Sequence, residues 1–333
     1  MSRSAFIIGG TGQIGIAAAA ALLREGWAVT LGHTGRRPPR NVPAGAALAA
    51  VDRKDTAALV DAIGTSDLVL DTIAFRGADA DQLVSLSDRY GQLMVVSSAS
   101  VYADSQGRSL ETPALGLPEF DGPVPETQLT VAPGPESYSS AKVELEQRLL
   151  ETASRPVTIL RPCAIHGINS THPREWWLLK RMLDGRKVIP LAGGGTTRFH
   201  TTATVNLGAL IAHTANAPKT QILNSGDPSP PSAREIGEAL AALVGWDGEF
   251  LTAPEDSDIG GTPWSVPSDF LVSMKAAETL GYRGTGYAET LPPYVDWMKA
   301  HAADWKSAFP VFGHYPSDPF DYAAEDAAFA DTQ

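Results

Sequence analysis

The sequence predicts an α/β fold, in which a doubly wound parallel sheet is followed by a smaller C-terminal α/β lobe. The first half alternates short β-branched runs with segments of helical spacing, which is typical of parallel strands joined by helical crossovers. A glycine-rich turn follows the first of these runs. The chain has 333 residues, of which 43 % are hydrophobic, so it can build a large core. At roughly 150 residues per domain, this length fits about two domains.

The elements of the first half can be placed in order. Strands are expected at Ala5–Ile8, Ala28–Leu31, Ala46–Val51, Asp67–Leu70, Gln92–Ser97 and Val157–Leu160. Helices are expected at Gln13–Glu25, Thr56–Ile63, Ala78–Tyr90 and Tyr138–Thr152. The crossover Thr34–Gly45 contains Pro38 and Pro39 in succession, which cannot lie inside a helix. We therefore expect a loop between the second and third strands.

The pattern after the sixth strand is looser and predicts the smaller lobe. Helices are expected at Glu175–Asp184, Val205–Ala215, Ala233–Val244 and Ala288–Ala302, and a strand at Gln221–Asn224. We place a Rossmann-type sheet domain at 1–165, with later strands returning to it at about 198–225, and a substrate lobe mainly at 166–320. The stretch 321–333 contains acidic residues and no Lys or Arg, so a solvated acidic tail is expected there.

The charge balance limits the choice of partners. The 26 Lys and Arg residues stand against 38 Asp and Glu, which gives a net charge of −12 and disfavours binding to nucleic acid or to a membrane surface. Cys163 is the only cysteine, so neither an intrachain disulfide nor a cysteine-based zinc site is expected. The sequence contains no signal-peptide pattern and no long apolar span. We therefore expect a cytoplasmic protein with a small-molecule substrate.

The turn after the first strand, residues 9–15, reads GGTGQIG. Gly9, Gly12 and Gly15 are spaced by three and open a helix. Glycines at these positions let backbone N–H groups approach a pyrophosphate, and the helix N-terminus adds partial positive charge. A glycine triplet alone could be an ordinary turn, but its place between a strand and a helix predicts dinucleotide binding.

The segment after the second strand indicates which dinucleotide is bound. It has no carboxylate for the ribose hydroxyls of NAD(H), and it has Arg36 and Arg37 where the 2′-phosphate of NADP(H) would lie, unless both are merely solvated loop charges. Asp52 and Arg53 follow the third strand and are placed to contact the adenine, although Asp52 could instead cap the helix near Asp55. The predicted cofactor contacts are Gly9, Thr11, Gly12, Gln13, Ile14, His33, Arg36, Arg37, Asp52, Arg53, Thr72, Ala74, Lys142 and Pro162.

Two further motifs predict acid–base chemistry. Tyr138 and Lys142 lie four residues apart and share one face of a predicted helix. A tyrosine pKa of about 10 makes the phenol a poor catalyst at neutral pH, and a nearby ammonium lowers that pKa by stabilising the phenolate. The fifth strand ends in a serine-rich segment containing Ser98, at the edge of the sheet where ligands bind in doubly wound folds.

With the motifs GGTGQIG, VDRKD, SSASVY, YSSAK and RPCAIHG in this order, the chain resembles the extended branch of the short-chain dehydrogenase/reductase superfamily. That branch includes nucleotide-sugar epimerases, dehydratases and carbonyl reductases. The resemblance implies Tyr138 as the acid–base residue, Lys142 as the modulator of its pKa and ribose anchor, and Ser98 as the hydroxyl that orients the substrate oxygen, with Ser100 beside it. It is also consistent with a monomer or a homodimer. No metal is expected, because the histidines lack paired-ligand spacing.

The substrate side gives weaker signals. Residues 103–136 contain six prolines and no clear helix or strand pattern, and we expect a lid there, closing with Trp176, Trp177 and Trp264. The alternative is that these tryptophans pack in a core. Arg198 is similar to the arginine that faces the diphosphate in nucleotide-sugar members of the branch. The predicted substrate contacts are Ser98, Tyr138, Trp176 and Arg198.

These observations favour an NADP(H)-dependent oxidoreductase that moves a hydride between the nicotinamide and a carbonyl or carbinol of a small organic molecule. The family's dehydratases usually carry an Asp-Glu pair where this chain has Ala99 and Ser100, and its epimerases usually hold NAD through an acidic residue after the second strand, which is absent here. One alternative is a nucleotide-sugar epimerase or related sugar-modifying enzyme with tightly held NAD(P). A second is a non-catalytic NADP(H)-sensing regulator, against which the intact catalytic motifs argue.

Overall fold

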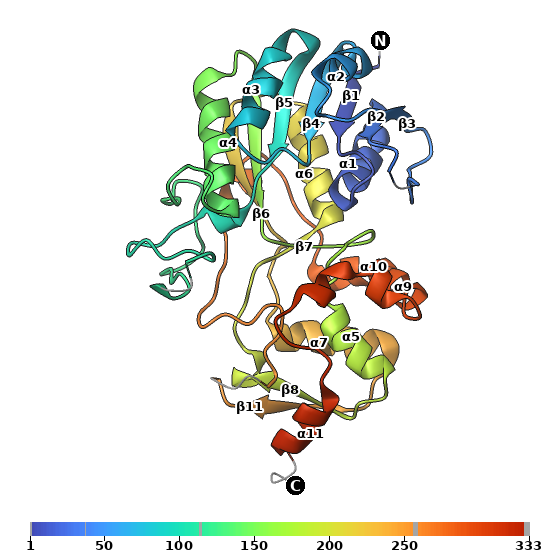
Figure 1. Cartoon of the computed structure of the whole chain (residues 1–333), viewed down its shortest axis with the longest axis vertical. Coiled ribbons are helices and arrows are strands. Elements are labelled where there is room, and N and C mark those ends of the chain that lie inside the picture. The colour runs from blue at the N-terminus through green and yellow to red at the C-terminus, as the bar shows by residue number, and fades with distance from the viewer. Residues whose placement is uncertain (1, 37, 113–114, 256–258, 330–333) are drawn as a thin grey trace.

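The computed structural model describes residues 2–36, 38–112, 115–255 and 259–329. Its main sheet has seven parallel strands in the order β10-β6-β5-β4-β1-β2-β3 (Figure 1). The strands are β1 (Ser4–Ile8), β2 (Ala28–His33), β3 (Ala47–Ala50), β4 (Ser66–Asp71), β5 (Tyr90–Val96), β6 (Val157–Pro162) and β10 (Gln221–Ser225). The predicted α/β class is confirmed, and β10 brings a segment from late in the sequence to the edge of the sheet.

Helices cover both faces of the sheet. On one face lie α1 (Gln13–Arg24), α6 (Thr204–Ala215) and α8 (Lys275–Thr279), and on the other lie α2 (Thr56–Ile63), α3 (Gly77–Ser85) and α4 (Tyr138–Thr152). Ile7 and Leu70 point toward the first set, and Phe6 and Val69 point toward the second. Side chains alternate along a strand, so these apolar strands are buried on both faces, as a doubly wound fold requires. Helix α3 ends earlier than expected, because Ser87–Arg89 form a 3₁₀ turn that leads into β5.

Helices α1 and α6 pack closely on the same face of the sheet. A Cβ atom at Gly208 would lie 2.6 Å from the backbone oxygen of Ala17, so a side chain at this position would push the two helices apart. Leu207, Leu210 and Ile211 of α6 join the core that contains α1 and the strands. Helix α6, which begins beyond residue 200, therefore completes the hydrophobic core that α1 forms with the sheet.

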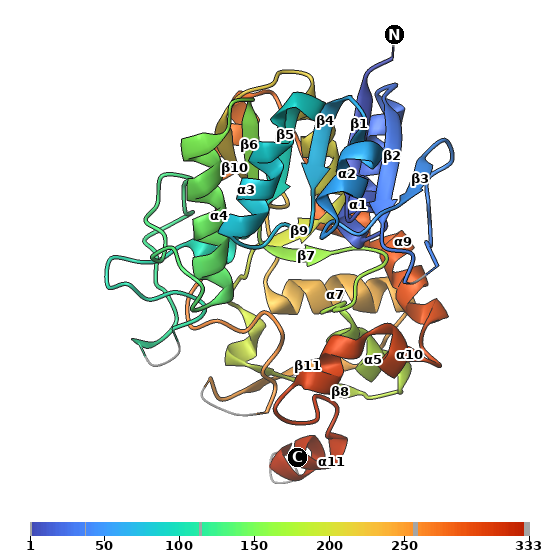
Figure 2. The same ribbon diagram turned by 45° about the horizontal axis from the view of Figure 1, so that its top comes forward.

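The smaller lobe lies beyond the carboxyl edge of the sheet (Figures 1 and 2). Its helices are α5 (Trp176–Leu183), α7 (Ala233–Val244), α9 (Tyr287–Ala300), α10 (Trp305–Ala308) and α11 (Tyr322–Phe329). Its strands β8 (Val188–Ala192) and β11 (Glu249–Ala253) pair in parallel, and β7 (Ala164–His166) pairs with β9 (Thr201–Ala203) at the junction with the sheet domain. No helix in the described part of the chain is long and apolar enough to cross a bilayer.

The C-terminal segment is not solvated throughout, contrary to expectation. Glu325 of α11 is buried, and its carboxylate lies 2.5 Å from a guanidinium nitrogen of the buried Arg181 in α5. Asp326 pairs with Arg186 at 2.5 Å. A buried guanidinium needs an opposite charge beside it, and the acidic segment supplies one. Composition alone could not reveal this, because the partners lie far apart in the sequence.

Candidate active site

The glycine turn after β1 lets three backbones approach closely. Gly9 has a φ of 72°, which favours glycine. A Cβ at Gly10 would lie 2.8 Å from the Cα of Leu31 in β2, and one at Gly15 would lie 2.6 Å from the Cα of Gly10. Gly12 is the N-cap residue of α1, and no side chain caps this helix end. The first N–H groups of α1 are therefore open to an anionic ligand.

Two buried polar atoms beside this turn lack partners. The Oε1 atom of Gln13 and the Oγ atom of Ser97 have no hydrogen bond to any described residue. Both residues line the same cavity, at the carboxyl edge of the sheet. Buried polar atoms are rarely left unpaired, so a ligand that pairs with them fits this place. Thr72, another predicted contact, donates its hydroxyl hydrogen bond to the backbone oxygen of Ile8 at 3.0 Å. Together with the uncapped helix end, these atoms fit a dinucleotide.

The ends of β2 and β3 bring two predicted contacts together. The Arg36 side chain is 76 % exposed, and its guanidinium lies 3.3 Å from the Asp52 carboxylate. Asp55, and not Asp52, accepts the N-cap hydrogen bond of α2, so Asp52 is free of the capping role that the sequence left open. The ring of His33 accepts a hydrogen bond from the following turn at 3.1 Å. Arg37 lies outside the described residues.

Arg53 has a structural role that the sequence did not suggest. Its side chain is mostly buried, with one guanidinium nitrogen 2.7 Å from the Asp71 carboxylate and the other 3.3 Å from that of Asp79. Burial raises the pKa of Asp71, and Arg53 counters part of this rise. The guanidinium of Arg53, predicted as a cationic contact to the cofactor, is therefore already paired with two carboxylates, one of them at the end of β4.

Ser98 and Tyr138 line one cavity of about 480 Å³. Ser98 follows β5, where its hydroxyl accepts a hydrogen bond from the backbone N–H of Ser100 at 3.1 Å and begins a 3₁₀ turn. Tyr138 is the first residue of α4, and Ser137 caps that helix. Tyr138 as a whole residue is 44 % exposed, and its ring packs against the ring of Phe75 with 5.5 Å between centroids. The structure thus brings together the two hydroxyls that the sequence singled out.

Lys142 lies near Tyr138, with its ammonium 5.7 Å from the centroid of the Tyr138 ring. It is buried, and its ammonium donates hydrogen bonds to the backbone oxygens of Ala74 at 2.7 Å and Val96 at 2.9 Å. Burial lowers the pKa of Lys142 to about 8. Desolvation raises the pKa of Tyr138, and a hydrogen bond from Ser98 lowers it in part. The predicted i, i+4 pair therefore shares one helix face, and the effect of Lys142 on the pKa of Tyr138 stays a prediction.

No protein-family model and no curated protein matches the chain. Solved structures do match it. The UDP-glucose 4-epimerase of Thermus thermophilus in complex with NAD is 19 % identical, with a TM-score of 0.66 over 89 % of this chain and 99 % of that one. The dTDP-glucose 4,6-dehydratase of Bacillus anthracis str. Ames in complex with NAD is 17 % identical, with a TM-score of 0.68 over 92 % of this chain and 100 % of that one. A putative epimerase from Burkholderia cenocepacia J2315 is 22 % identical, with a TM-score of 0.68 over 90 % and 99 %.

The chain has the fold of the extended short-chain dehydrogenases/reductases. The resemblance seen in the sequence motifs is therefore confirmed at the level of the fold. The likeness covers the C-terminal lobe as well as the parallel sheet, since nearly the full length of each matched structure is included.

Two predicted substrate contacts lie outside the cavity at Tyr138. Trp176 is 1 % exposed and packs edge-on against Phe309 with 5.3 Å between ring centroids, inside the core of the smaller lobe. Trp264 is buried in the same core. Arg198 is not among the residues that line the Tyr138 cavity, and its Nε atom lies 2.9 Å from the Asp269 carboxylate. The core-packing alternative is therefore right for Trp176, and the charge of Arg198 is already compensated.

Several residues of the cavity were not predicted. Glu111 comes from the proline-rich segment, and its carboxylate accepts a hydrogen bond from the backbone N–H of Ser139 at 2.8 Å. His172 and Arg174 come from the irregular stretch after β7, and Cys163 follows β6. Cys163 lies inside the RPCAIHG motif but had no role assigned to it, and no periodicity or motif marks Glu111, His172 or Arg174, so the folded arrangement identifies these three.

The proline-rich segment is anchored rather than free. Val124 pairs with Val272 in a parallel bridge, and Tyr102 pairs with Thr130. Val124 is also 1 % exposed, in a small core that contains Phe270. The segment that carries Glu111 is thus fixed to the chain near residue 272, and the described part of it forms one wall of the cavity.

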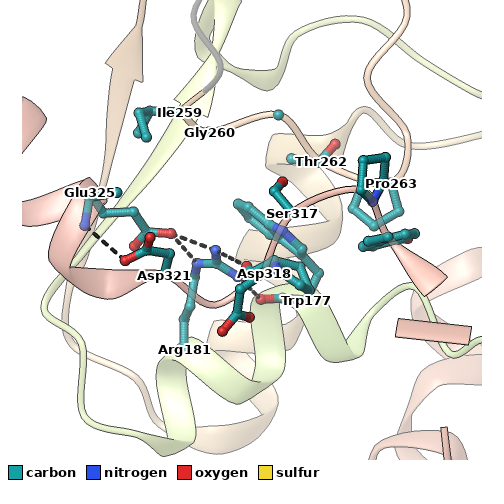
Figure 3. Close-up of a pocket in the computed structure, with 15 residues that line it drawn as sticks. Trp177, Arg181, Ile259, Gly260, Thr262, Pro263, Ser317, Asp318, Asp321 and Glu325 are labelled. Atoms are coloured by element: carbon teal, nitrogen blue, oxygen red, sulfur yellow. Dashed lines mark hydrogen bonds and ion pairs between the residues drawn. The ribbon is translucent and has the colours of Figure 1, made fainter. Parts of the chain in front are cut away.

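A larger cavity, of about 570 Å³, lies in the smaller lobe (Figure 3). Its main charged group is the guanidinium of Arg181, which lies 3.5 Å from the centroid of the Trp177 ring and pairs with Glu325. Arg181 also donates hydrogen bonds to the backbone oxygens of Trp177 and Pro319, both at 2.7 Å. Because this guanidinium is fully engaged and the glycine turn does not line this cavity, we place the chemistry in the smaller cavity at Tyr138.

Proposed function

We propose that this protein is an NADP(H)-dependent oxidoreductase that reduces a carbonyl group of a small organic molecule. The observation that carries the proposal is one cavity lined by Ser98, Tyr138 and Gln13. It joins two hydroxyls suited to an activated oxygen to the start of α1, where the glycine turn leaves N–H groups open. The unpaired Oγ atom of Ser97 in the same cavity supports a ligand there.

The residues around the glycine turn would hold the cofactor. The open N-terminus of α1 would bind the pyrophosphate, and Arg36 would bind the 2′-phosphate in exchange for its exposed pairing with Asp52. When bound, the nicotinamide supplies the hydride that reduces the carbonyl carbon. The Lys142 ammonium, held by the backbone oxygens of Ala74 and Val96, lies 5.7 Å from the centroid of the Tyr138 ring.

Tyr138 would supply the matching proton. Its pKa is raised by desolvation, so the phenol is protonated at neutral pH and can donate its proton to the carbonyl oxygen. Ser98 donates a hydrogen bond to the same oxygen. The carbonyl carbon thus gains a hydride, its oxygen gains the phenolic proton, and an alcohol forms. The phenolate is then reprotonated from solvent, since Tyr138 as a whole residue is 44 % exposed. A phenol that keeps its proton suits reduction better than oxidation.

A second candidate is a sugar-modifying enzyme such as an epimerase. It is favoured by the solved structures of this fold, among them a UDP-glucose 4-epimerase and a dTDP-glucose 4,6-dehydratase, each in complex with NAD. An epimerase returns the hydride to its substrate and shows no net oxidation of added cofactor. A chain purified with bound cofactor that leaves NADPH unchanged with every carbonyl tested would support this candidate.

The test follows NADPH oxidation by absorbance with a panel of aldehydes and ketones. Tyr138→Phe should lower kcat by about 10²- to 10⁴-fold, the usual contribution of a positioned acid. Tyr90→Phe is a matched control, because the Tyr90 hydroxyl is buried and donates to the backbone oxygen of Leu83 at 2.8 Å, outside the cavity. Unchanged turnover in Tyr138→Phe would show that another group supplies the proton.

A further inference from the structure

One basic side chain in the cavity at Tyr138 has no partner. Arg174 lines this cavity, and its guanidinium makes no hydrogen bond and no ion pair with any described residue. Other shielded arginines are paired with carboxylates: Arg53 with Asp71, Arg161 with Glu146, Arg181 with Glu325. A partly buried guanidinium that lacks an acceptor has lost hydrogen bonds to water without gaining charge-assisted hydrogen bonds in the protein, which costs free energy. Arg174 is therefore available to a ligand in this cavity.

No carboxylate in the described part of the chain forms an ion pair with Arg174. His172 beside it is hydrogen-bonded to the Tyr315 hydroxyl at 2.7 Å, and burial together with Arg174 lowers its pKa to about 4, so it is neutral at pH 7. Glu111 is the one carboxylate among the described lining residues, and it is held by the backbone of Ser139 and forms no ion pair with Arg174. The cavity thus has a cationic wall, formed by Arg174, in the same space as the Tyr138 phenol.

The arginine that the sequence suggested for an anion is not in a position to replace Arg174. Arg198 is paired with Asp269 through its side chain, and the backbone N–H of Arg198 donates to the same carboxylate at 2.8 Å. Arg198 does not line the cavity at Tyr138. In this chain, a negatively charged substrate group near the catalytic hydroxyls therefore has Arg174 as its cationic partner.

We propose that Arg174 binds an oxyanion, a carboxylate or a phosphate, carried by the substrate whose carbonyl oxygen lies at Ser98 and Tyr138. The substrate class is then an anionic carbonyl compound rather than a neutral one. This inference rests on the proposed reductase function for the carbonyl, whereas the anion site itself rests on the cavity and the unpaired guanidinium.

The experiment compares matched substrates that differ in one charge. Benzoylformate and its methyl ester test a carboxylate, and dihydroxyacetone phosphate and dihydroxyacetone test a phosphate, each with NADPH. The preference in kcat/KM for the charged member of a pair should fall about 10- to 100-fold in Arg174→Gln, as expected for the loss of a charge-assisted hydrogen bond. Arg174→Lys should restore part of it, and the control Arg198→Gln should leave it unchanged. The pair that shows the effect identifies the oxyanion.

A second measurement does not depend on turnover. Benzoate and inorganic phosphate are titrated by calorimetry into the wild-type chain and into Arg174→Gln, with unfolding temperatures confirming that the variant is folded. Anion binding that is lost in Arg174→Gln, with no carbonyl reduced, would support the anion site and overturn the reductase function. Neutral carbonyls reduced as well as charged ones by both chains would overturn the anion site and leave the function standing. Binding of both anions that is equal in the two chains would likewise overturn the anion site.

Discussion

The buried ammonium of Lys142 gives a stability prediction that can be calculated. Burial lowers its pKa from 10.5 to about 8 in the folded chain. Keeping Lys142 charged at pH 7 therefore costs the folded state about 3 kcal/mol relative to the unfolded state. Between pH 8 and 10.5 the unfolded chain holds this proton while the folded chain releases it. The contribution of Lys142 to the free energy of unfolding thus rises with pH across that window, by about 2 kcal/mol between pH 7 and pH 9.5.

The assay is urea unfolding of the wild type and of Lys142→Met at these two pH values. Methionine keeps an unbranched apolar stem but removes the titrating group and the hydrogen bonds to Ala74 and Val96. The stability of the variant at a single pH therefore reflects both the lost charge and the lost hydrogen bonds. The informative quantity is how the difference in free energy of unfolding between the two chains changes with pH. The free energy of unfolding of the wild type, relative to that of the variant, should rise by about 2 kcal/mol from pH 7 to pH 9.5.

A suitable control is Lys219→Met, which removes a lysine from an exposed position. It accounts for the general effect of one fewer basic residue on the acidic chain. A difference between wild type and Lys142→Met that is the same at both pH values, within about 0.5 kcal/mol, would refute the reasoning. Lys142 would then be charged at equal cost in both states, and its burial would have to be relieved by a group not seen in the structure.

Two further substitutions test the cofactor end. Arg36→Ala should raise the Kd for NADPH about tenfold or more in a fluorescence titration, while NADH binding changes little, because in the proposed complex the 2′-phosphate, which NADH lacks, would replace Asp52 as the partner of Arg36. Equal losses for the two cofactors would place the 2′-phosphate elsewhere. Arg53→Met should lower the free energy of unfolding in urea by about 3–5 kcal/mol, since it leaves Asp71 buried without its opposite charge. The double variant Arg53→Met, Asp71→Asn should recover much of that loss, and an equal loss in both chains would argue against the ion pair.

The sequence predicted the parts of the site that depend on local pattern. In a parallel sheet all carboxyl ends meet at one edge, so the order of the motifs alone placed Ser98 and the glycine turn on the same side of the sheet. Tyr138 was predicted on the same grounds, because a fixed spacing marked it at the start of a helix. Strand limits were predicted to within two residues in the first half, since continuous apolar runs bounded by turn residues define buried strands.

What the sequence could not predict depends on contacts between distant segments. A tryptophan can lie in a core or line a pocket. Only its contact with Phe309 in the folded chain shows that Trp176 lies in a core. The role of Arg53 depends on Asp71 of another strand, and that of Lys142 on the backbone oxygens that its ammonium contacts. The strands of the smaller lobe are short, and each pairs with a strand far away in the sequence. So few residues show no alternation of apolar and polar side chains from which a strand could be predicted.

The close packing of α1 on α6 determines when the sheet domain can be completed during synthesis. The apolar face of α1 emerges from the ribosome within the first 24 residues, but α6, which covers it, begins at Thr204, and the edge strand β10 ends at Ser225. All of α5 and β8 of the smaller lobe must therefore be translated before α6 can cover this face, and α8, on the same face, follows later still. A nascent chain of about 200 residues exposes hydrophobic surface on one face of its sheet, and domains of this kind fold as a unit only once their last contact is available. The nascent chain therefore carries this uncovered apolar face until α6 and β10 have been made.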